Sequence, residues 1–310
     1  MYKSKLPLVS VIMPVYNAGD FLVPAIESIL KQTYQKFELI IVNDHSTDAT
    51  YQILRSYQKQ FPKKIKVINL TKRHGAYGAA NIGILQARGD FIAPMDSDDI
   101  SHPQRLKKQV KCLLSNPQVI VVGTQANVID KNNHIIGQKT FPTRHQEIYK
   151  KFLEVHPIVH PSCMIRRNLL PQKNKLYEDK FGVNDDYFTF FTLFKYGKFA
   201  NLPEYLLDYR IHLGNSSLQN IKQKFFNTIK IRFIAIRSLG YKPTLGGLVK
   251  MLGQIVFVAP LPESLLLISY LLIKEVYSPQ EIKMTITKKL DFAFAKARKF
   301  SFALIGILMR

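Results

Sequence analysis

The stretch that decides the fold is Phe91–Ile100, FIAPMDSDDI, in which an apolar run leads directly into Asp96, Asp98 and Asp99. It reads as a buried strand that ends in an acidic turn. Such a cluster is costly to build, because like charges a few ångströms apart repel one another. It usually occurs where a divalent cation or a hydroxyl-rich ligand offsets the repulsion. A solvated turn, or an aspartate cap for a helix from Pro103, is the simpler alternative.

Upstream of this stretch, strand-like and helix-like segments alternate, which predicts an open, mostly parallel α/β sheet flanked by helices. We expect strands at 8–14, 37–42 and 64–70, and helices at 21–32, at 49–60 and from the glycine turn at 75–78. From about 119 to 165 the strands shorten, which predicts a mixed or antiparallel edge. Ligands bind at the carboxyl ends of strands in such sheets. The polar residues expected to meet there are Tyr16, Asp44, Asp48, Asp96 and Asp98.

The composition limits the partners. The formal charge of +22 over 310 residues requires an anionic partner, such as nucleic acid, an anionic membrane surface or a phosphorylated substrate. We expect no nucleic acid, because the chain has no arginine-rich block, zinc-ligand spacing or RNA-stacking motif. Two cysteines are too few for a disulfide framework, which favours a reducing compartment. The N-terminus reads as a first strand and not as a signal peptide.

The sequence changes character near residue 219. Residues 220–310 contain 15 Lys or Arg and four Asp or Glu, interleaved with apolar runs. Residues 251–273 are apolar enough to touch a membrane, but two prolines and Glu263 interrupt them, so an interfacial or re-entrant hairpin fits better than a spanning helix. We therefore predict an α/β domain over 1–218 and a helical, basic and apolar region over 219–310. An amphipathic helix packed on the first domain is the alternative.

Five motifs, in this order, resemble the family-2 glycosyltransferases, which have the GT-A fold. They are VSVIMPVYNAGDFLVPAIESILKQTYQKFELIIVNDHSTDAT at 9–50, the glycine turn with Asn81, MDSDDISHPQRL at 95–106, Asn184–Tyr187 and Tyr209–His212. The resemblance spans roughly residues 6–217. It implies a cytoplasmic, metal-dependent enzyme that transfers a hexose or N-acetylhexosamine from a nucleotide-sugar.

The resemblance also implies a nucleotide site, usually for uridine. Pro14, Val15 and Tyr16 would line the base, and Asp44 would accept a hydrogen bond from the uracil N–H. Asp48 would either contact the ligand or cap the helix from Ala49.

Asn81 and Arg210 complete the nucleotide residues that the resemblance implies, and the forked guanidinium of Arg210 suits phosphate oxygens. Many members carry an arginine just before this asparagine, where the present chain has Ala80. Lys72, Arg73 or His74 would have to supply that charge. UDP, GDP and dTDP therefore stay open as the nucleotide.

The acidic turn matches the Asp-x-Asp motif of the family. By this resemblance Asp98 would coordinate Mg²⁺ or Mn²⁺ bridging the two phosphates, and Asp96 would face the ribose or the water shell of the metal. His212 would contact the diphosphate or complete the metal shell. A buried structural histidine is the alternative for His212.

On the acceptor side, the resemblance makes Asp186 the general base of an inverting transfer. Asp185 would bind acceptor hydroxyls or hold its neighbour in place, and a helix N-terminus at this pair is compatible with both roles. His156 and His160 are further acceptor-side candidates. The implied acceptor is a glycan or a lipid-linked molecule in surface polysaccharide synthesis, at the inner face of the cytoplasmic membrane.

Two other functions compete with this prediction. A sugar-nucleotide nucleotidyltransferase would share the nucleotide, the metal and the sheet, but it would carry a glycine-rich, basic loop after its first strand. The segment Tyr16–Asp20 lacks such a loop. A non-catalytic scaffold at a membrane surface, with a degenerate transferase fold, would have no need for Asp96, Asp98 and Asp186.

Overall fold

A computed structural model describes residues 6–212, 214–215, 220–262 and 265–266 of the chain. The chain divides into two units, Met1–Pro260 and Leu261–Arg310. Every helix and strand labelled below belongs to the first unit. Glu263 and residues 267–310, which the sequence assigned to the helical region, lie outside the described residues.

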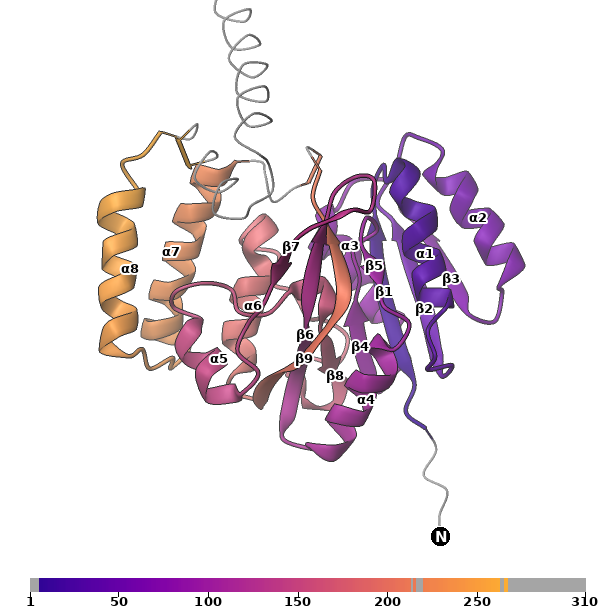
Figure 1. Cartoon of the computed structure of the whole chain (residues 1–310). Helices are drawn as coiled ribbons and strands as arrows, with labels where there is room; N and C mark the ends of the chain where they lie inside the picture. The colour runs from indigo at the N-terminus through magenta and orange to yellow at the C-terminus, as the bar shows by residue number, and fades with distance from the viewer. Residues whose placement is uncertain (1–5, 213, 216–219, 263–264, 267–310) are drawn as a thin grey trace, which may run out of the picture. The chain divides into compact units, whose positions relative to one another are not determined.

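One open sheet occupies the centre of the first unit (Figure 1). Its order is β3-β2-β1-β4-β8-β6-β9-β5, with β7 paired to β6. In chain order the strands are β1 (Val9–Val15), β2 (Phe37–Asn43), β3 (Ile65–Asn69), β4 (Phe91–Pro94), β5 (Ile100–Ser101), β6 (Val119–Ile129), β7 (Ile135–Lys139), β8 (Met164–Arg166) and β9 (Lys198–Arg210).

The first four strands of this order run parallel to one another. β8 is antiparallel to β4 and β6, while β9 is parallel to β6 and antiparallel to β5. The predicted open α/β fold is confirmed. Antiparallel pairs do occur within the predicted range 119–165, in β6, β7 and β8. The expected shortening is wrong for β6, which has 11 residues, and the antiparallel strand β5 lies before this range.

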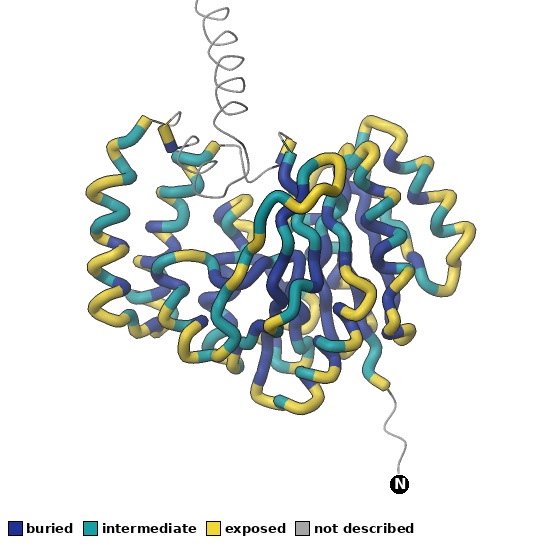
Figure 2. The backbone as a smooth tube through the Cα atoms, viewed as in Figure 1, coloured by how far each residue is buried: buried dark blue, intermediate teal, exposed yellow. Residues whose placement is uncertain are grey.

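Helices cover both faces of the parallel strands. In β2, Ile40 and Val42 pack with α3 (Gly75–Leu85), whereas Leu39 and Ile41 pack with the other face. That second face is covered by α1 (Leu22–Leu30), α2 (Thr50–Gln60) and α4 (Arg105–Ser115). Successive side chains of a strand point to opposite faces, so an unbroken apolar run is expected when both faces are buried. Figure 2 shows the resulting buried sheet beneath exposed helix surfaces.

A glycine sets how closely α3 approaches the sheet. A Cβ atom at Gly83 would lie 2.9 Å from Ile12 Cγ2 and 3.1 Å from Val42 Cγ2, so a larger residue would push the helix outward. The close approach holds the first turn of α3 at the carboxyl end of β2. There the N–H of Gly75 donates to Asp44 at 2.9 Å.

Four helices belong to the second half of the first unit: α5 (His145–Lys151), α6 (Asp185–Leu193), α7 (Ile221–Ser238) and α8 (Leu245–Val258). The last three share one hydrophobic core, through Phe191, Ile231 and Met251. The boundary predicted after residue 218 thus falls within this unit. No helix in the described part of the chain is both long enough and apolar enough to cross a membrane.

Candidate active site

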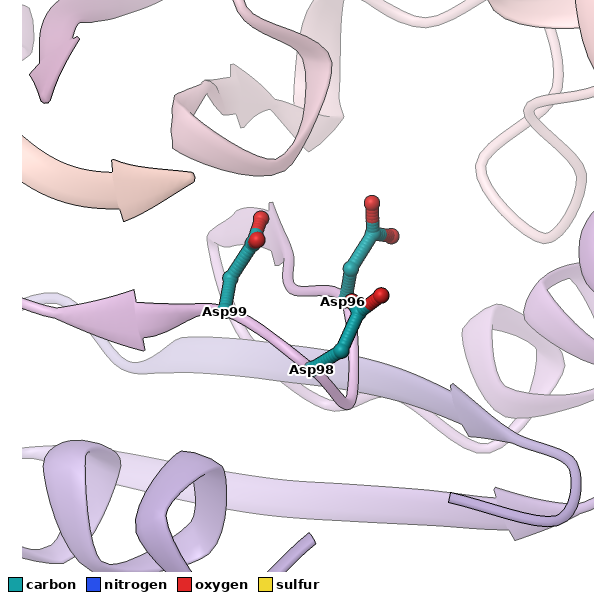
Figure 3. A group of neighbouring side chains, drawn as sticks. All are labelled: Asp96, Asp98 and Asp99. Atoms are coloured by element: carbon teal, nitrogen blue, oxygen red, sulfur yellow. The ribbon is translucent and has the colours of Figure 1, made fainter. Parts of the chain in front are cut away.

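The acidic turn singled out by the sequence joins β4 to β5. Asp96, Asp98 and Asp99 each bring a carboxylate oxygen within 4.8 Å of the others, and Figure 3 shows the three side chains leaving one turn. β4 runs parallel to β1, and β1 to β2, so their carboxyl ends share one edge of the sheet. This is the edge at which ligands bind in open α/β sheets.

Nearby positive charge only partly compensates the carboxylates of this turn. Burial, followed by the charges of Asp98 and Asp186, raises the pKa of Asp96 to about 7. Burial and the same turn's charges raise the pKa of Asp99 well above its ordinary value. Asp99 Oδ2 is buried and has no hydrogen-bond partner among the described residues. The turn therefore fits a divalent cation, which would supply positive charge and a partner for this oxygen, because Mg²⁺ and Mn²⁺ prefer carboxylate ligands.

The end of β9 and the segment after it hold the acidic turn in place. His212 Nε2 lies 3.1 Å from Asp98 Oδ2, and Asn215 Nδ2 donates to the same oxygen at 3.4 Å. Arg210 is buried, and its Nε donates to the Asp98 carbonyl at 2.7 Å, while its backbone N–H donates to Asp99 Oδ1 at 2.8 Å. His212 thus lies beside a predicted metal ligand. Arg210, predicted at the nucleotide, has its hydrogen bonds with the protein backbone and the turn.

Two further cations act on the acidic turn. Arg105, at the start of α4, is fully buried, and burial lowers its pKa to about 10 although Cys163, Asp99 and Asp96 oppose the shift. Lys139, at the end of β7, lowers the pKa of both Asp96 and Asp99 by its charge. Its Nζ lies 3.2 Å from the centre of the Tyr209 ring. The site therefore carries positive charge that partly offsets its carboxylates.

The predicted acidic pair begins α6. Asp185 is buried and accepts three backbone N–H groups, from Asp179, Lys180 and Phe181. It therefore fixes the loop that precedes the helix. Asp186 differs, because its side chain is 17% exposed and so is open to a hydroxyl group. A helix N-terminus stabilises negative charge, so the helix start and a reactive carboxylate coexist here.

The Asp186 carboxylate lies among imidazole and phenol groups. His156 Nε2 is 3.5 Å from Asp186 Oδ2 and has no hydrogen-bond partner among the described residues. Burial lowers the pKa of His156, although the Asp186 charge opposes the shift, so the imidazole is neutral near pH 7. Burial, followed by the charge of Asp186, raises the pKa of Tyr77 well above its ordinary value. Both groups can thus orient the carboxylate without donating a full positive charge.

The residues predicted to bind the base follow β1 and β2. Asp44 is buried and accepts hydrogen bonds from Arg73 Nε at 3.0 Å and from the N–H groups of His74 and Gly75 at 2.7 and 2.9 Å. The Arg73 guanidinium also lies over the Tyr16 ring, with Cζ 3.2 Å from the ring centre. Arg73 is therefore in contact with two of the predicted base-binding residues.

The other predicted nucleotide residues have structural contacts. Pro14 and Val15 end β1 next to Tyr16. Asp48 Oδ1 accepts the N–H of Thr50 at 3.0 Å, although the N-cap of α2 is Ala49 and not Asp48. Asn81 uses its whole amide on one backbone segment, since it donates to the Tyr177 carbonyl at 2.7 Å and accepts the N–H groups of Leu176 and Tyr177.

Sequence reasoning gave no role to Arg105, Lys139, Asn215 or Tyr77. Arg105 stands within the motif MDSDDISHPQRL, and Tyr77 within the glycine turn, so both had a signal nearby. Asn215 follows His212 closely in the chain. Lys139 had no such signal, because only the pairing of β7 with β6 brings it to the site.

Comparison with known proteins agrees with this geometry. Residues 10–172 match the model of glycosyl transferase family 2. An uncharacterized glycosyltransferase of Haemophilus influenzae is 34% identical over 227 residues, which are 70% of each chain. An uncharacterized glycosyltransferase of Methanocaldococcus jannaschii is 35% identical over 222 residues, 70% of this chain and 76% of the relative.

Solved structures share the fold. TarS of S. aureus in complex with UDP has a TM-score of 0.62 at 21% identity, covering 83% of this chain and 74% of TarS. The mannosyltransferase PcManGT from Pyrobaculum calidifontis, in complex with GDP-Man and Mn²⁺, has a TM-score of 0.55 at 20% identity, covering 94% of this chain and 87% of that one.

The sheet order, the flanking helices and the acidic turn define an α/β enzyme of the GT-A type. The match to the family model and the sequence identity to relatives show which family the chain belongs to. The chain belongs to glycosyl transferase family 2. The predicted family and fold are both confirmed, and the protein is a glycosyltransferase.

Proposed function

We propose that this glycosyltransferase moves a hexose or N-acetylhexosamine from a UDP-sugar to a hydroxyl of a glycan or lipid-linked acceptor, with inversion at the anomeric carbon. One observation carries the proposal: the partly exposed Asp186 lies within electrostatic reach of Asp96 in the acidic turn. A base for the acceptor and carboxylates for a cation–diphosphate group therefore share one site.

The chemistry is an in-line displacement. Asp186 accepts the proton of the acceptor hydroxyl while that oxygen forms its bond to the anomeric carbon. The bond from the anomeric carbon to the diphosphate oxygen breaks, and its electron pair leaves with the nucleoside diphosphate. His156 and Tyr77 orient the Asp186 carboxylate, and Asp185 positions the loop in front of it.

A divalent cation, Mn²⁺ or Mg²⁺, fits the acidic turn. Asp98, Asp96 and Asp99 would hold it, with His212 beside Asp98. When bound, the ion supplies positive charge that stabilises the diphosphate leaving group. The complex of PcManGT with GDP-Man and Mn²⁺ supports a cation in a protein of this fold.

The ends of β1 and β2 are the best candidates for the nucleotide site. Tyr16 offers an aromatic face and Asp44 a buried acceptor, and Arg73 lies between them. The UDP complex of TarS supports uridine. Asp48, Asn81 and Arg210 stay predicted nucleotide residues, although each is hydrogen-bonded to the backbone of another residue: Thr50, Tyr177 and Asp98 respectively.

We place the enzyme at the inner face of the cytoplasmic membrane, in surface polysaccharide synthesis. The support is electrostatic, because a chain of formal charge +22 is attracted to anionic headgroups. A lipid-linked acceptor would be present at that surface.

Calorimetric titration of UDP, and separately of GDP, into the protein with and without Mn²⁺ tests the proposal. We expect UDP binding that requires the metal and that is lost in Asp98→Ala. Preference for GDP would contradict the assigned nucleotide. No binding of either nucleotide with any metal would contradict the assigned site.

A further inference from the structure

The outer face of α8 carries an unbroken apolar stripe. Leu245, Val249, Leu252 and Val256 recur at the spacing of one helix face, and they are 79%, 60%, 55% and 63% exposed. Phe257, 76% exposed, lies next to this stripe. Single exposed apolar side chains are ordinary on protein surfaces, but an aligned row on one helix is not. We call these five residues the α8 stripe.

The α8 stripe is not the side by which the helix joins the fold. The opposite face of α8 is buried through Gly247 and Met251, and Leu248 and Ile255 pack against the core. The helix is thus apolar on two sides, of which one packs on the core of the first unit and the other is exposed. In Figure 2 α8 lies at the margin of the first unit, with exposed positions along its length. A helix of this kind requires an apolar medium on its second side.

The two helices around the stripe, α7 and α8, carry cations and no carboxylates of their own, although Glu154 pairs with Lys250 of α8 at 2.9 Å. Residues 220–262 contain seven Lys or Arg and no Asp or Glu. On α7, the exposed side chains of Phe226, Lys230, Phe233 and Arg237 follow the same helical spacing and line one surface hollow. Apolar side chains that alternate with cations are typical of helices that lie in the headgroup region of a membrane.

A buried arginine joins these helices to the acceptor side of the site. Arg232 of α7 donates from Nη1 to Gln254 of α8 at 2.5 Å, and from Nε to the Tyr187 hydroxyl at 3.0 Å. Tyr187 directly follows Asp186. Arg232 Nη2 donates to the carbonyl of Glu154 at 2.8 Å, and Glu154 lies two residues before His156. Hydrogen bonds of one buried arginine therefore connect the helix that carries the stripe with the groups that surround the proposed base.

We propose that the α8 stripe docks on the surface of an anionic lipid bilayer, with the exposed cations Lys230, Arg237 and Lys242 supplying the electrostatic attraction. A second copy of the chain is a poorer occupant, because it would bring together two surfaces whose helices carry cations and no carboxylates of their own. Docking would bring a lipid-linked acceptor to Asp186; this purpose of docking rests on the proposed function, but the docking itself does not.

The chain contains no tryptophan, so one introduced tryptophan reports on its own position alone. Val256→Trp places the probe on the α8 stripe. Leu114→Trp, at a side chain of α4 that is 55% exposed, is the matched control. We expect the emission of Val256→Trp to shift to shorter wavelength with vesicles of phosphatidylcholine and phosphatidylglycerol, and to be quenched by brominated lipid. The emission of Leu114→Trp should not change.

Two results would overturn the proposal. One is an unshifted Val256→Trp spectrum with these vesicles, even if the full chain binds them, because another segment would then make the contact. The other is a shift without vesicles that grows with protein concentration, because a second copy would then cover the stripe.

A second measurement uses vesicle flotation of the full chain. We expect Leu252→Asn/Val256→Asn to weaken binding on the order of tenfold, since it removes the apolar contact. Leu85→Asn/Leu114→Asn, at equally exposed positions on α3 and α4, should bind like the unaltered chain. Equal binding by both variants would contradict docking through α8. UDP binding, measured on the same samples, tests the proposed function separately.

Discussion

The carboxyl group of Asp186 stands at the first turn of α6 with one oxygen accepting the N–H of Tyr187 at 2.7 Å and the other facing His156 at 3.5 Å. Its neighbour Asp185 is buried and bound to three backbone N–H groups. Two adjacent aspartates thus have different roles because their surroundings differ. One is fixed within the protein, and the other is available to a substrate.

Replacing Asp186 tests the base directly. Asp186→Asn keeps the shape but cannot accept the hydroxyl proton, so we expect turnover to fall by about 10²–10⁴. UDP affinity, measured by calorimetry, should be unchanged. Asp179→Asn is the control, because Asp179 contributes its backbone N–H to Asp185 and keeps it in the variant. Full turnover by Asp186→Asn would exclude this residue as the base.

His156 should act through Asp186. It packs against aromatic rings, including Tyr187 and Phe190 at ring-centre distances of 5.2 and 5.3 Å, so His156→Phe preserves the packing but removes the N–H. We expect kcat to fall by roughly ten- to a hundredfold with little change in the KM of the donor. His156→Gln restores a donor and should recover part of the loss. Equal kcat values for the Phe and Gln variants would assign His156 a packing role only.

At the scale of elements, the predicted and observed strands and helices agree wherever the local sequence pattern is enough to identify the element. The predicted strands at 8–14, 37–42 and 64–70 and the predicted helices at 21–32 and 49–60 agree with β1, β2, β3, α1 and α2 to within about two residues. Apolar runs and helical periodicity suffice for these. The two-residue strand β5 and its pairing with β9 were not predicted, because its partner lies more than a hundred residues away.

The candidate site likewise contains residues that the sequence pattern identifies and contacts that it does not. The acidic turn and the Asp185–Asp186 pair are visible in the sequence because their residues are adjacent. The contact of Arg73 with Tyr16, the charge of Lys139 at Asp96 and the use of Asn81 on residues 176–177 are not. Each depends on which elements the sheet order brings together, and spacing along the chain does not encode this.

Glu38 links neighbouring elements and allows a stability test. Its carboxylate accepts hydrogen bonds from Ser10 of β1 at 2.7 Å and from the backbone and side chain of Arg88 before β4. Burial alone would raise the pKa of Glu38, but these hydrogen bonds and the Arg88 charge outweigh it and lower the pKa. The carboxylate therefore stabilises the fold fully above the unfolded-state pKa of about 4.3.

We expect Glu38→Gln to reduce the free energy of unfolding by about 1–3 kcal/mol near pH 7. This stabilisation is lost as pH falls through the lowered folded-state pKa, so the difference between Glu38→Gln and the unaltered chain should shrink below about pH 4. Urea unfolding of both proteins across this range provides the measurement. A difference that stays constant with pH would show that charge at Glu38 contributes nothing.

At the scale of the whole molecule, charge and chemistry are distributed unevenly. The acidic turn, which we propose as the cation site, lies at one edge of the sheet, while the charged residues of 220–262 are all cations. The first region would attract a metal ion, and the second would repel it. On our proposal, this asymmetry separates the binding of a metal-bound donor from the attraction to an anionic surface.

Salt should distinguish these two kinds of binding. Attraction between exposed cations and lipid headgroups is screened over about 8–10 Å at physiological ionic strength. We expect vesicle binding to weaken on the order of tenfold or more as NaCl is raised, and UDP binding with saturating Mn²⁺ to change much less. Sucrose at matched osmolality is the control. Vesicle binding that does not respond to salt would mean that the cations take no part.

The residues that hold the acidic turn in place lie much later in the sequence than the turn itself. Asp98 and Asp99 are held by Arg210, His212 and Asn215, which follow them by more than a hundred positions. During synthesis on a ribosome, β1 to β4 are complete well before these residues exist. A nascent or truncated chain thus has the parallel strands but an unsupported cluster of negative charge. We expect the proposed cation site to acquire its geometry only late in translation, so that incomplete chains would be unable to carry out the proposed transfer.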